Sequence, residues 1–161
     1  MATRTLLYAT DYSEASEAAF DYAVRLARDL GARLVIAHVS ENELMPVGEA
    51  VDEVPAPNAE ELARLREIKP RGDHGPVEYK LLYAEPTCQS IDPAREIIRF
   101  ADQARVEAIV VGTHGRRGLT RALCGSVAEQ LVRRAHCPVV TVRQQCAAAP
   151  LGDEVGEAWT S

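Results

Sequence analysis

The sequence has few features of a secreted, membrane-bound or metal-binding protein. Residues 1–5 carry one arginine and no apolar stretch long enough for a signal peptide, and no later segment approaches the length of a membrane span. Cys88, Cys124, Cys137 and Cys146 form no CxxC pair and none of the paired Cys/His spacings of zinc sites. We therefore expect a cytoplasmic protein with reduced thiols, no metal site and no membrane attachment.

An excess of basic residues is also absent. The formal net charge is -6, whereas non-specific nucleic-acid binding needs an extended basic face that displaces counterions. Nucleic acid is therefore not an expected partner. The segment 112–143 differs from the rest, because it carries six arginines against the single acid Glu129. Three of these arginines, Arg116, Arg117 and Arg121, lie in a glycine-rich run, and such a local cluster suits a small, highly charged ligand.

Several enzyme motifs are missing. The turn after the first predicted strand contains Asp11 and no GxGxxG, which argues against a dinucleotide-binding dehydrogenase. Gly125 stands before Ser126 where a P-loop has lysine. A receiver domain needs an acidic cluster after the first strand and a lysine after the fifth, and the sequence has neither. A hydrolytic set of Asp11, His114, Ser126 and His136 can be drawn on paper, but no GxSxG elbow accompanies it.

The pattern of the chain fits one α/β domain. Its 161 residues are 47% hydrophobic and 26% charged, enough for a substantial core. Strand-like and helix-like segments alternate, which is typical of a parallel sheet covered by helices on both faces. The predicted strands span residues 5–9, 34–39, 77–83, 108–111 and 138–142, and the predicted helices span 14–30, 59–68, 93–103 and 126–135. We expect a Rossmann-like, five-stranded sheet in the order 3-2-1-4-5 within residues 1–143, followed by a flexible tail over 144–161.

Capping residues and apolar spacing define the predicted helices. Ser13 and Asp92 are expected N-caps, Pro93 occupies a first helical position, and Gly31 follows a helix end. The first helix is expected to bury a stripe of Ala15, Ala18, Ala19, Tyr22, Ala23, Leu26, Ala27 and Leu30. The third is expected to bury Ile97, Ile98 and Ala101, and the last Val127, Leu131, Val132 and Ala135.

The run from Gly112 to Ser126 is the most informative part of the sequence. Gly112 and Gly115 are expected to adopt positive φ and to let the backbone approach a ligand without an intervening Cβ. Gly125 and Ser126 then open a helix whose free N–H groups and positive dipole end favour an anion, and Ser126 can cap this helix as well. The run therefore predicts a phosphate site.

A second loop is expected to face this run. Ligands of doubly wound sheets bind at the carboxyl ends of the strands where the strand order reverses, here between the first and fourth strands. The loop from Thr10 to Ser13 leaves the first strand at this point. Asp11 would accept a hydrogen bond from the adenine amino group while the glycine run holds the phosphates. The alternative for Asp11 is a turn or capping residue ahead of the first helix.

These residues resemble the nucleotide-binding branch of the universal stress protein family. The family spacing of GxxG, nine residues and Gly-Ser or Gly-Thr is matched by Gly112, Gly115, Gly125 and Ser126, and the early aspartate by Asp11. The likeness covers about residues 3–143 and implies an adenine nucleotide alpha hydrolase-like fold. It also implies ATP binding, with or without Mg²⁺, through Asp11 and Val39 on the adenine and ribose side and through the glycines, Ser126 and Val127 on the phosphate side. The complete set of expected site residues is Thr10, Asp11, Val39, Gly112, His114, Gly115, Arg116, Gly125, Ser126 and Val127.

The fifth predicted strand points to a partner. Residues 138–142 are short, valine-rich and terminal in the expected order, and soluble proteins pair or cover such an edge. The resemblance implies a homodimer through this strand, and the alternative is an edge shielded by the tail. It also implies a role in stress response or signalling through nucleotide occupancy. No catalytic residues are predicted; slow ATP hydrolysis stays open, as does an interaction module with an unoccupied pocket.

Overall fold

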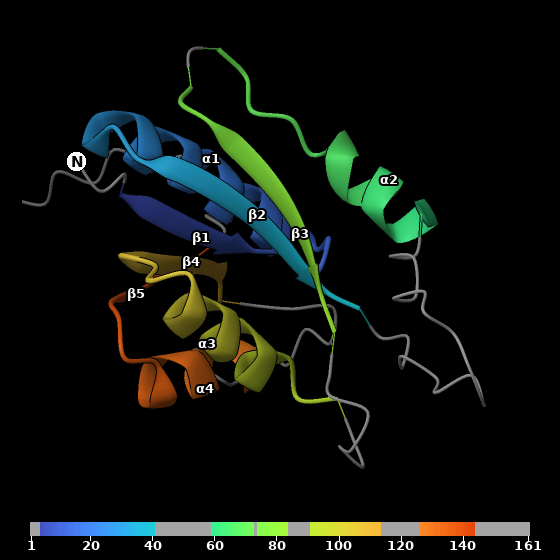
Figure 1. The fold of residues 1–161 in the computed structure, drawn as a ribbon, viewed down its shortest axis with the longest axis vertical. Helices are drawn as coiled ribbons and strands as arrows, with labels where there is room; N and C mark the ends of the chain where they lie inside the picture. Colours follow the sequence, from blue (N-terminus) through green and yellow to red (C-terminus); the bar gives the residue numbers. More distant parts are fainter. Residues whose placement is uncertain (1–3, 41–58, 73, 84–90, 114–125, 144–161) are drawn as a thin grey trace, which may run out of the picture.

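A parallel sheet of five strands in the order β3-β2-β1-β4-β5 forms the centre of the structure (Figure 1). The computed structural model describes residues 4–40, 59–72, 74–83, 91–113 and 126–143. The strands are β1 (Thr5–Ala9), β2 (Arg33–Val39), β3 (Val77–Leu82), β4 (Ala108–Gly112) and β5 (Val139–Val142). The helices are α1 (Glu14–Leu30), α2 (Ala59–Glu67), α3 (Pro93–Gln103) and α4 (Ser126–Arg134). The predicted fold and strand order are confirmed, and element ends differ from prediction by at most one residue. Among the described helices, none is long and apolar enough to cross a membrane.

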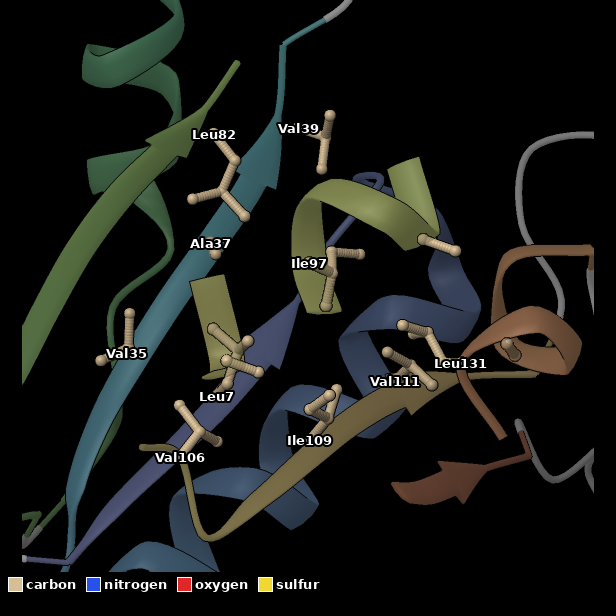
Figure 2. Packing of buried hydrophobic residues seen from close by; sticks show 13 residues of the cluster. Leu7, Val35, Ala37, Val39, Leu82, Ile97, Val106, Ile109, Val111 and Leu131 are labelled. Carbon is tan, nitrogen blue, oxygen red and sulfur yellow. The ribbon is translucent and has the colours of Figure 1, made fainter. Parts of the chain in front are cut away.

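Helices cover both faces of the sheet, and each face has its own apolar core. Figure 1 shows α3 and α4 together on one side of the sheet and α1 on the other. Side chains alternate along β1, so that Leu7 enters the core under α3 and α4 (Figure 2) while Leu6 and Tyr8 enter the core under α1 and α2. Because the central strands are buried on both faces, they are mostly apolar, with Thr5 and His38 as buried polar exceptions.

Helix α1 lies close to the sheet because the side that it buries is made of small residues. Ala15, Ala19, Ala23 and Ala27 are all buried, as predicted. Tyr22 was predicted to join them and instead is 37% exposed. An alanine-lined contact brings the helix too near the sheet for a tyrosine to fit beneath it, so this ring lies at the border of the buried face.

The ends of α1 are capped as the sequence predicts. The Ser13 side chain accepts a hydrogen bond from the Ser16 amide at 3.3 Å. Gly31 takes the left-handed conformation with φ of 60°, and its N–H donates to the Arg28 carbonyl. Asp92 and Pro93 open α3 in the predicted manner, with Asp92 accepting from the Arg95 amide.

Helix α4 buries a narrower face than predicted. Leu131 is fully buried, and Val127 and Ala135 pack against the same core from half-buried positions. Val132 was predicted to be buried but is 57% exposed. One residue along a helix turns the side chain by about 100°, so the position after Leu131 faces away from the core.

The end of β4 touches the first turn of α1. A Cβ built on Gly112 would lie 2.6 Å from the Ala15 carbonyl oxygen and 3.0 Å from the Ser16 nitrogen. Gly112 is the last residue of the strand, and within the described ranges the glycines with positive φ are Gly31 and Gly72. The expected positive φ of Gly112 is therefore wrong. The position has no room for a side chain because strand and helix backbones meet there.

Substitution of Gly112 tests this backbone contact. Gly112→Ala is expected to lower the free energy of unfolding by about 2–3 kcal/mol, because the new Cβ must displace helix backbone. Gly75→Ala is the matched control, since its Cβ would meet one atom, the Ala32 carbonyl oxygen, at 3.1 Å. Urea denaturation followed by circular dichroism measures both. Equal losses for the two variants would contradict the proposed overlap.

Candidate functional site

The candidate site lies at the carboxyl ends of β1, β2 and β4. Strand β1 pairs in parallel with β2 on one side and with β4 on the other. Strands β2 and β3 are added on one side of β1, and β4 and β5 on the other, so the strand order reverses at this point. Ala9 stands opposite Ala37 of β2 and opposite Val111 of β4. The segment after β1 is thereby placed between the ends of its two neighbours, as the sequence predicts.

Asp11 organises the loop between β1 and α1. One oxygen of its carboxylate, Oδ1, accepts from the Ser13 amide at 3.0 Å, from the Ser13 hydroxyl at 2.6 Å and from the Ser16 hydroxyl at 2.6 Å. Of the two alternatives that the sequence offered for Asp11, the turn role is therefore present, while Ser13 caps α1. These contacts also fix the direction of the carboxylate, as a group that recognises a ligand requires.

Thr10 joins the same loop to β2. It is buried, its amide donates to the Ala37 carbonyl at 2.9 Å, and its own carbonyl accepts from His38 Nδ1 at 2.8 Å. Its hydroxyl oxygen accepts from the Tyr12 amide at 3.0 Å. Two hydrogen bonds to β2 thus hold the Thr10 backbone, and they fix the start of the loop that carries Asp11.

The end of β2 forms the opposite wall of this region. Val39 is buried and belongs to the core under α3 and α4, where Figure 2 shows it near Leu82 and Ile97. Ser40 follows it, fully buried, with its amide donating to the Leu82 carbonyl and its hydroxyl donating to Glu61 Oε2 at 2.6 Å. Packing and hydrogen bonds therefore fix the backbone that was expected to contact the base.

The remaining expected residues are those that the sequence assigns to the phosphate side, next to Thr113, which was not among the expected residues. Thr113 continues β4, is buried, and donates from its amide to the Val142 carbonyl at 3.0 Å. Ser126 is exposed at the first position of α4, and Val127 is half-buried beneath it. His114, Gly115, Arg116 and Gly125 lie outside the described residues.

Two side chains contact the ring of Tyr12, an arrangement that the sequence analysis did not predict. The ring centroids of Tyr12 and His38 are 4.5 Å apart, and the Arg64 guanidinium lies 4.0 Å from the Tyr12 centroid. Arg64 comes from α2, far away in the sequence. Neither the spacing of these residues nor their types signals the contact in advance.

Burial of Tyr8 contributes to the same loop from below. Desolvation raises the pKa of its hydroxyl well above the ordinary value. The neutral hydroxyl donates to the Ser16 carbonyl at 2.7 Å. This contact fixes the first turn of α1 to the sheet directly under the Asp11 loop.

Of the hydrolytic set drawn from the sequence, the structure describes Asp11, Ser126 and His136, and it separates His136 from the other two; His114 lies outside the described residues. His136 follows the end of α4 and lies 3.2 Å from Asp102 at the end of α3, whereas Ser126 begins α4. The nine residues of that helix separate the two ends by roughly 13 Å. Asp11 belongs to the loop after β1. His136 and Asp11 are therefore parts of different structural regions.

A cavity of about 390 Å³ between α3 and α4 is a second concave region. It is lined by Arg95, Ile98, Arg99, Asp102, Arg134 and His136. Two of its arginines form ion pairs with neighbouring carboxylates: Arg134 lies 3.0 Å from Asp92, and Arg99 lies 2.6 Å from buried Glu96. Burial alone would raise the pKa of the Asp92 carboxyl, but hydrogen bonds from Arg134 and the Arg95 amide hold this pKa below its ordinary value. The region is best described as an ion-pair network that joins two helices.

Comparisons with known proteins agree on one family. The model of the universal stress protein family matches residues 2–143. A universal stress protein of Methanocaldococcus jannaschii is 30% identical over 147 residues, covering 88% of this chain and 82% of its own length. The universal stress protein YxiE of Bacillus subtilis is 31% identical over 149 residues, with 86% and 97% covered.

Solved structures show the same fold. A universal stress protein in complex with cAMP superposes with a TM-score of 0.63 at 23% identity, covering 90% of this chain and 100% of its own. A universal stress protein from Archaeoglobus fulgidus in complex with dAMP gives a TM-score of 0.56 at 24% identity, with 88% and 99% covered.

Substitution of Asp11 tests its structural role separately from any ligand. Asp11→Ala is expected to lower the free energy of unfolding by about 1–2 kcal/mol, because two serine hydroxyls and one amide lose their acceptor. Asp11→Asn keeps an oxygen at the same place and should lose less than half as much. Both values come from urea denaturation without nucleotide. An alanine variant as stable as the parent would show that Asp11 does not hold the loop.

Proposed function

This chain belongs to the universal stress protein family, and from that premise we propose that it binds an adenine nucleotide at the carboxyl ends of β1, β2 and β4. ATP, with or without Mg²⁺, is the nucleotide that we propose. In this proposal the protein acts in stress response or signalling, and the presence of bound nucleotide controls that action. We place the binding unit in residues 1–143.

One juxtaposition carries the proposal. The loop with Asp11 and the end of β4 meet where the strand order reverses, which is the usual ligand position in such sheets. Two structural neighbours were solved with cAMP and with dAMP, both adenine nucleotides. Each is below 25% identity, so they support the fold directly and the ligand by analogy alone.

The donors and acceptors on the two sides suit the two ends of a nucleotide. On one side, a carboxylate held by Ser13 and Ser16 is an acceptor for an exocyclic amino group. On the other, α4 begins at Ser126, and the amides at a helix start favour phosphate. The sequence motif from Gly112 to Ser126 begins at the end of β4 and ends at the start of α4, so it links the sheet to the helix whose amides would bind phosphate.

Calorimetric titration of the purified full-length protein tests the ligand and its base preference. ATP is expected to bind at least tenfold more tightly than GTP, because guanine places a carbonyl where adenine has its amino group. Asp11→Asn should weaken ATP binding by at least about tenfold, since an oxygen kept on Ser13 and Ser16 leaves the amide NH2, a donor, to face the adenine amino group. Gly125→Val should weaken ATP binding and affect adenosine less.

The outcomes separate the candidate functions. Nucleotide released from the denatured protein, measured by anion exchange, would support occupancy, and phosphate release during incubation would reveal slow hydrolysis. No bound nucleotide and no uptake of ATP at millimolar concentration, with or without Mg²⁺, would favour an interaction module instead. A parent protein that binds ATP and GTP equally would refute the role of Asp11 in base recognition.

We also propose that two copies pair through β5. This strand is at the end of the sheet, and its four residues are all partly exposed. Ile109 donates to the Pro138 carbonyl and Thr113 to the Val142 carbonyl. Since backbone groups alternate along a parallel ladder, Val139 and Thr141 direct their N–H and C=O groups away from β4. That outer row is suited to pair with the same row of a second copy.

Thr141→Pro tests the pairing selectively. Proline removes one outward N–H and is tolerated where the N–H of an edge strand points away from its neighbour. The variant is expected to remain folded and to be monomeric when the parent is dimeric, as measured by light scattering after size exclusion. Thr141→Val keeps the N–H and should remain dimeric. A folded proline variant that still forms dimers would exclude this edge as the interface.

A further inference from the structure

We propose that Tyr12 is a positioning residue of the nucleotide site and that Arg64 of α2 sets the affinity of that site through the Tyr12 ring. The inference rests on the proposed function. It adds a residue from outside the sequence motif and a coupling between α2 and the binding loop.

The backbone of Tyr12 is in a conformation that needs support. Its φ is 63°, in the left-handed region that bulky residues rarely adopt. Tyr12 directly follows Asp11, and the Tyr12 amide donates to the Thr10 hydroxyl oxygen at 3.0 Å. If Tyr12 left this conformation, the turn that directs the Asp11 carboxylate would be lost.

Contacts with the Tyr12 ring supply the support. The ring of His38 lies at a centroid distance of 4.5 Å, tilted by 49°, and the Arg64 guanidinium lies at 4.0 Å from the Tyr12 centroid. Both distances are within the range of favourable aromatic and cation–π contacts. The imidazole and the guanidinium therefore stabilise one rotamer of Tyr12, and with it the left-handed turn.

Both partners of the ring are themselves fixed in place. His38 Nδ1 contacts the Thr10 carbonyl at 2.8 Å, which connects the imidazole back to the binding loop. Helix α2 is anchored by Leu65, which is fully buried, and by Glu61, which accepts from the Ser40 hydroxyl. Arg64 lies between these two anchors. A displacement of α2 would consequently alter the loop that presents Asp11.

Hydrogen exchange at individual amides, measured by NMR without nucleotide, tests the positioning role. The Tyr12 and Ser13 amides are bonded inside the loop, so they report its opening. Arg64→Ala should raise their exchange rates by about two- to fivefold, which is the factor that corresponds to losing the free energy of one exposed cation–π contact. The Ile109 amide, bonded to Pro138 in the sheet, should not change.

Matched variants separate the ring contacts from charge and from strain. Arg66→Ala removes the same charge from the same helix at another exposed position and should leave the loop amides unchanged. Tyr12→Phe keeps the ring and should resemble the parent. Tyr12→Asn removes the ring but tolerates left-handed backbone, so faster exchange in this variant would indicate the loss of ring contacts.

ATP titrations of the same variants test the coupling to the site. Arg64→Ala should raise the apparent Kd by between about twofold and the factor seen in exchange, because the ring contact orients the loop that presents Asp11 and the binding-competent fraction falls when it is lost; Arg66→Ala should leave Kd unchanged. If Arg64→Ala and Arg66→Ala give the same loop exchange, the positioning role is overturned. Faster exchange with an unchanged Kd would overturn the coupling. A parent protein that binds no nucleotide would refute the proposed function, while the exchange data would still decide the role of Tyr12.

Discussion

The approach of β4 to the first turn of α1 is the constraint on which the candidate site depends. Gly112 brings strand backbone against the peptide that joins Ala15 to Ser16, and the Ser16 hydroxyl donates to Asp11. The contact sets the separation between the loop after β1 and the end of β4. A residue with a side chain at this position would change that separation, because backbone atoms cannot move aside as a flexible side chain can.

Hydrogen bonds around Asp11 connect stability with recognition. The carboxylate holds the turn together by accepting from the Ser13 and Ser16 hydroxyls, and the same contacts hold it in one orientation. The structural and functional interpretations of Asp11 are therefore compatible. Beneath it, the Tyr8 hydroxyl and the Thr10 backbone fix the loop to the sheet. A preorganised acceptor costs less ordering entropy when a ligand binds than a mobile one would.

Much of the fold follows from local patterns. Alternation of apolar strands with amphipathic helices predicts all nine described elements, and the capping residues Ser13, Gly31 and Asp92 act as expected. Apart from the backbone conformation of Gly112, the errors concern residues at the borders of helix faces. Tyr22 and Val132 fit the helical period, but how much of a helix face is buried depends on how closely the helix approaches the sheet, and neighbouring side chains decide that distance.

The sequence by itself determined the family, the order of the elements and the positions of the loops that form the candidate site, because these depend on periodicity, caps and a motif of fixed spacing. Only the tertiary structure decided why Gly112 must be glycine and which groups support Asp11. It also brought Arg64 and His38 into contact with one tyrosine ring. Such contacts join segments that are distant along the chain. Their geometry arises from the packing of helices on the sheet, which no local pattern of residues encodes.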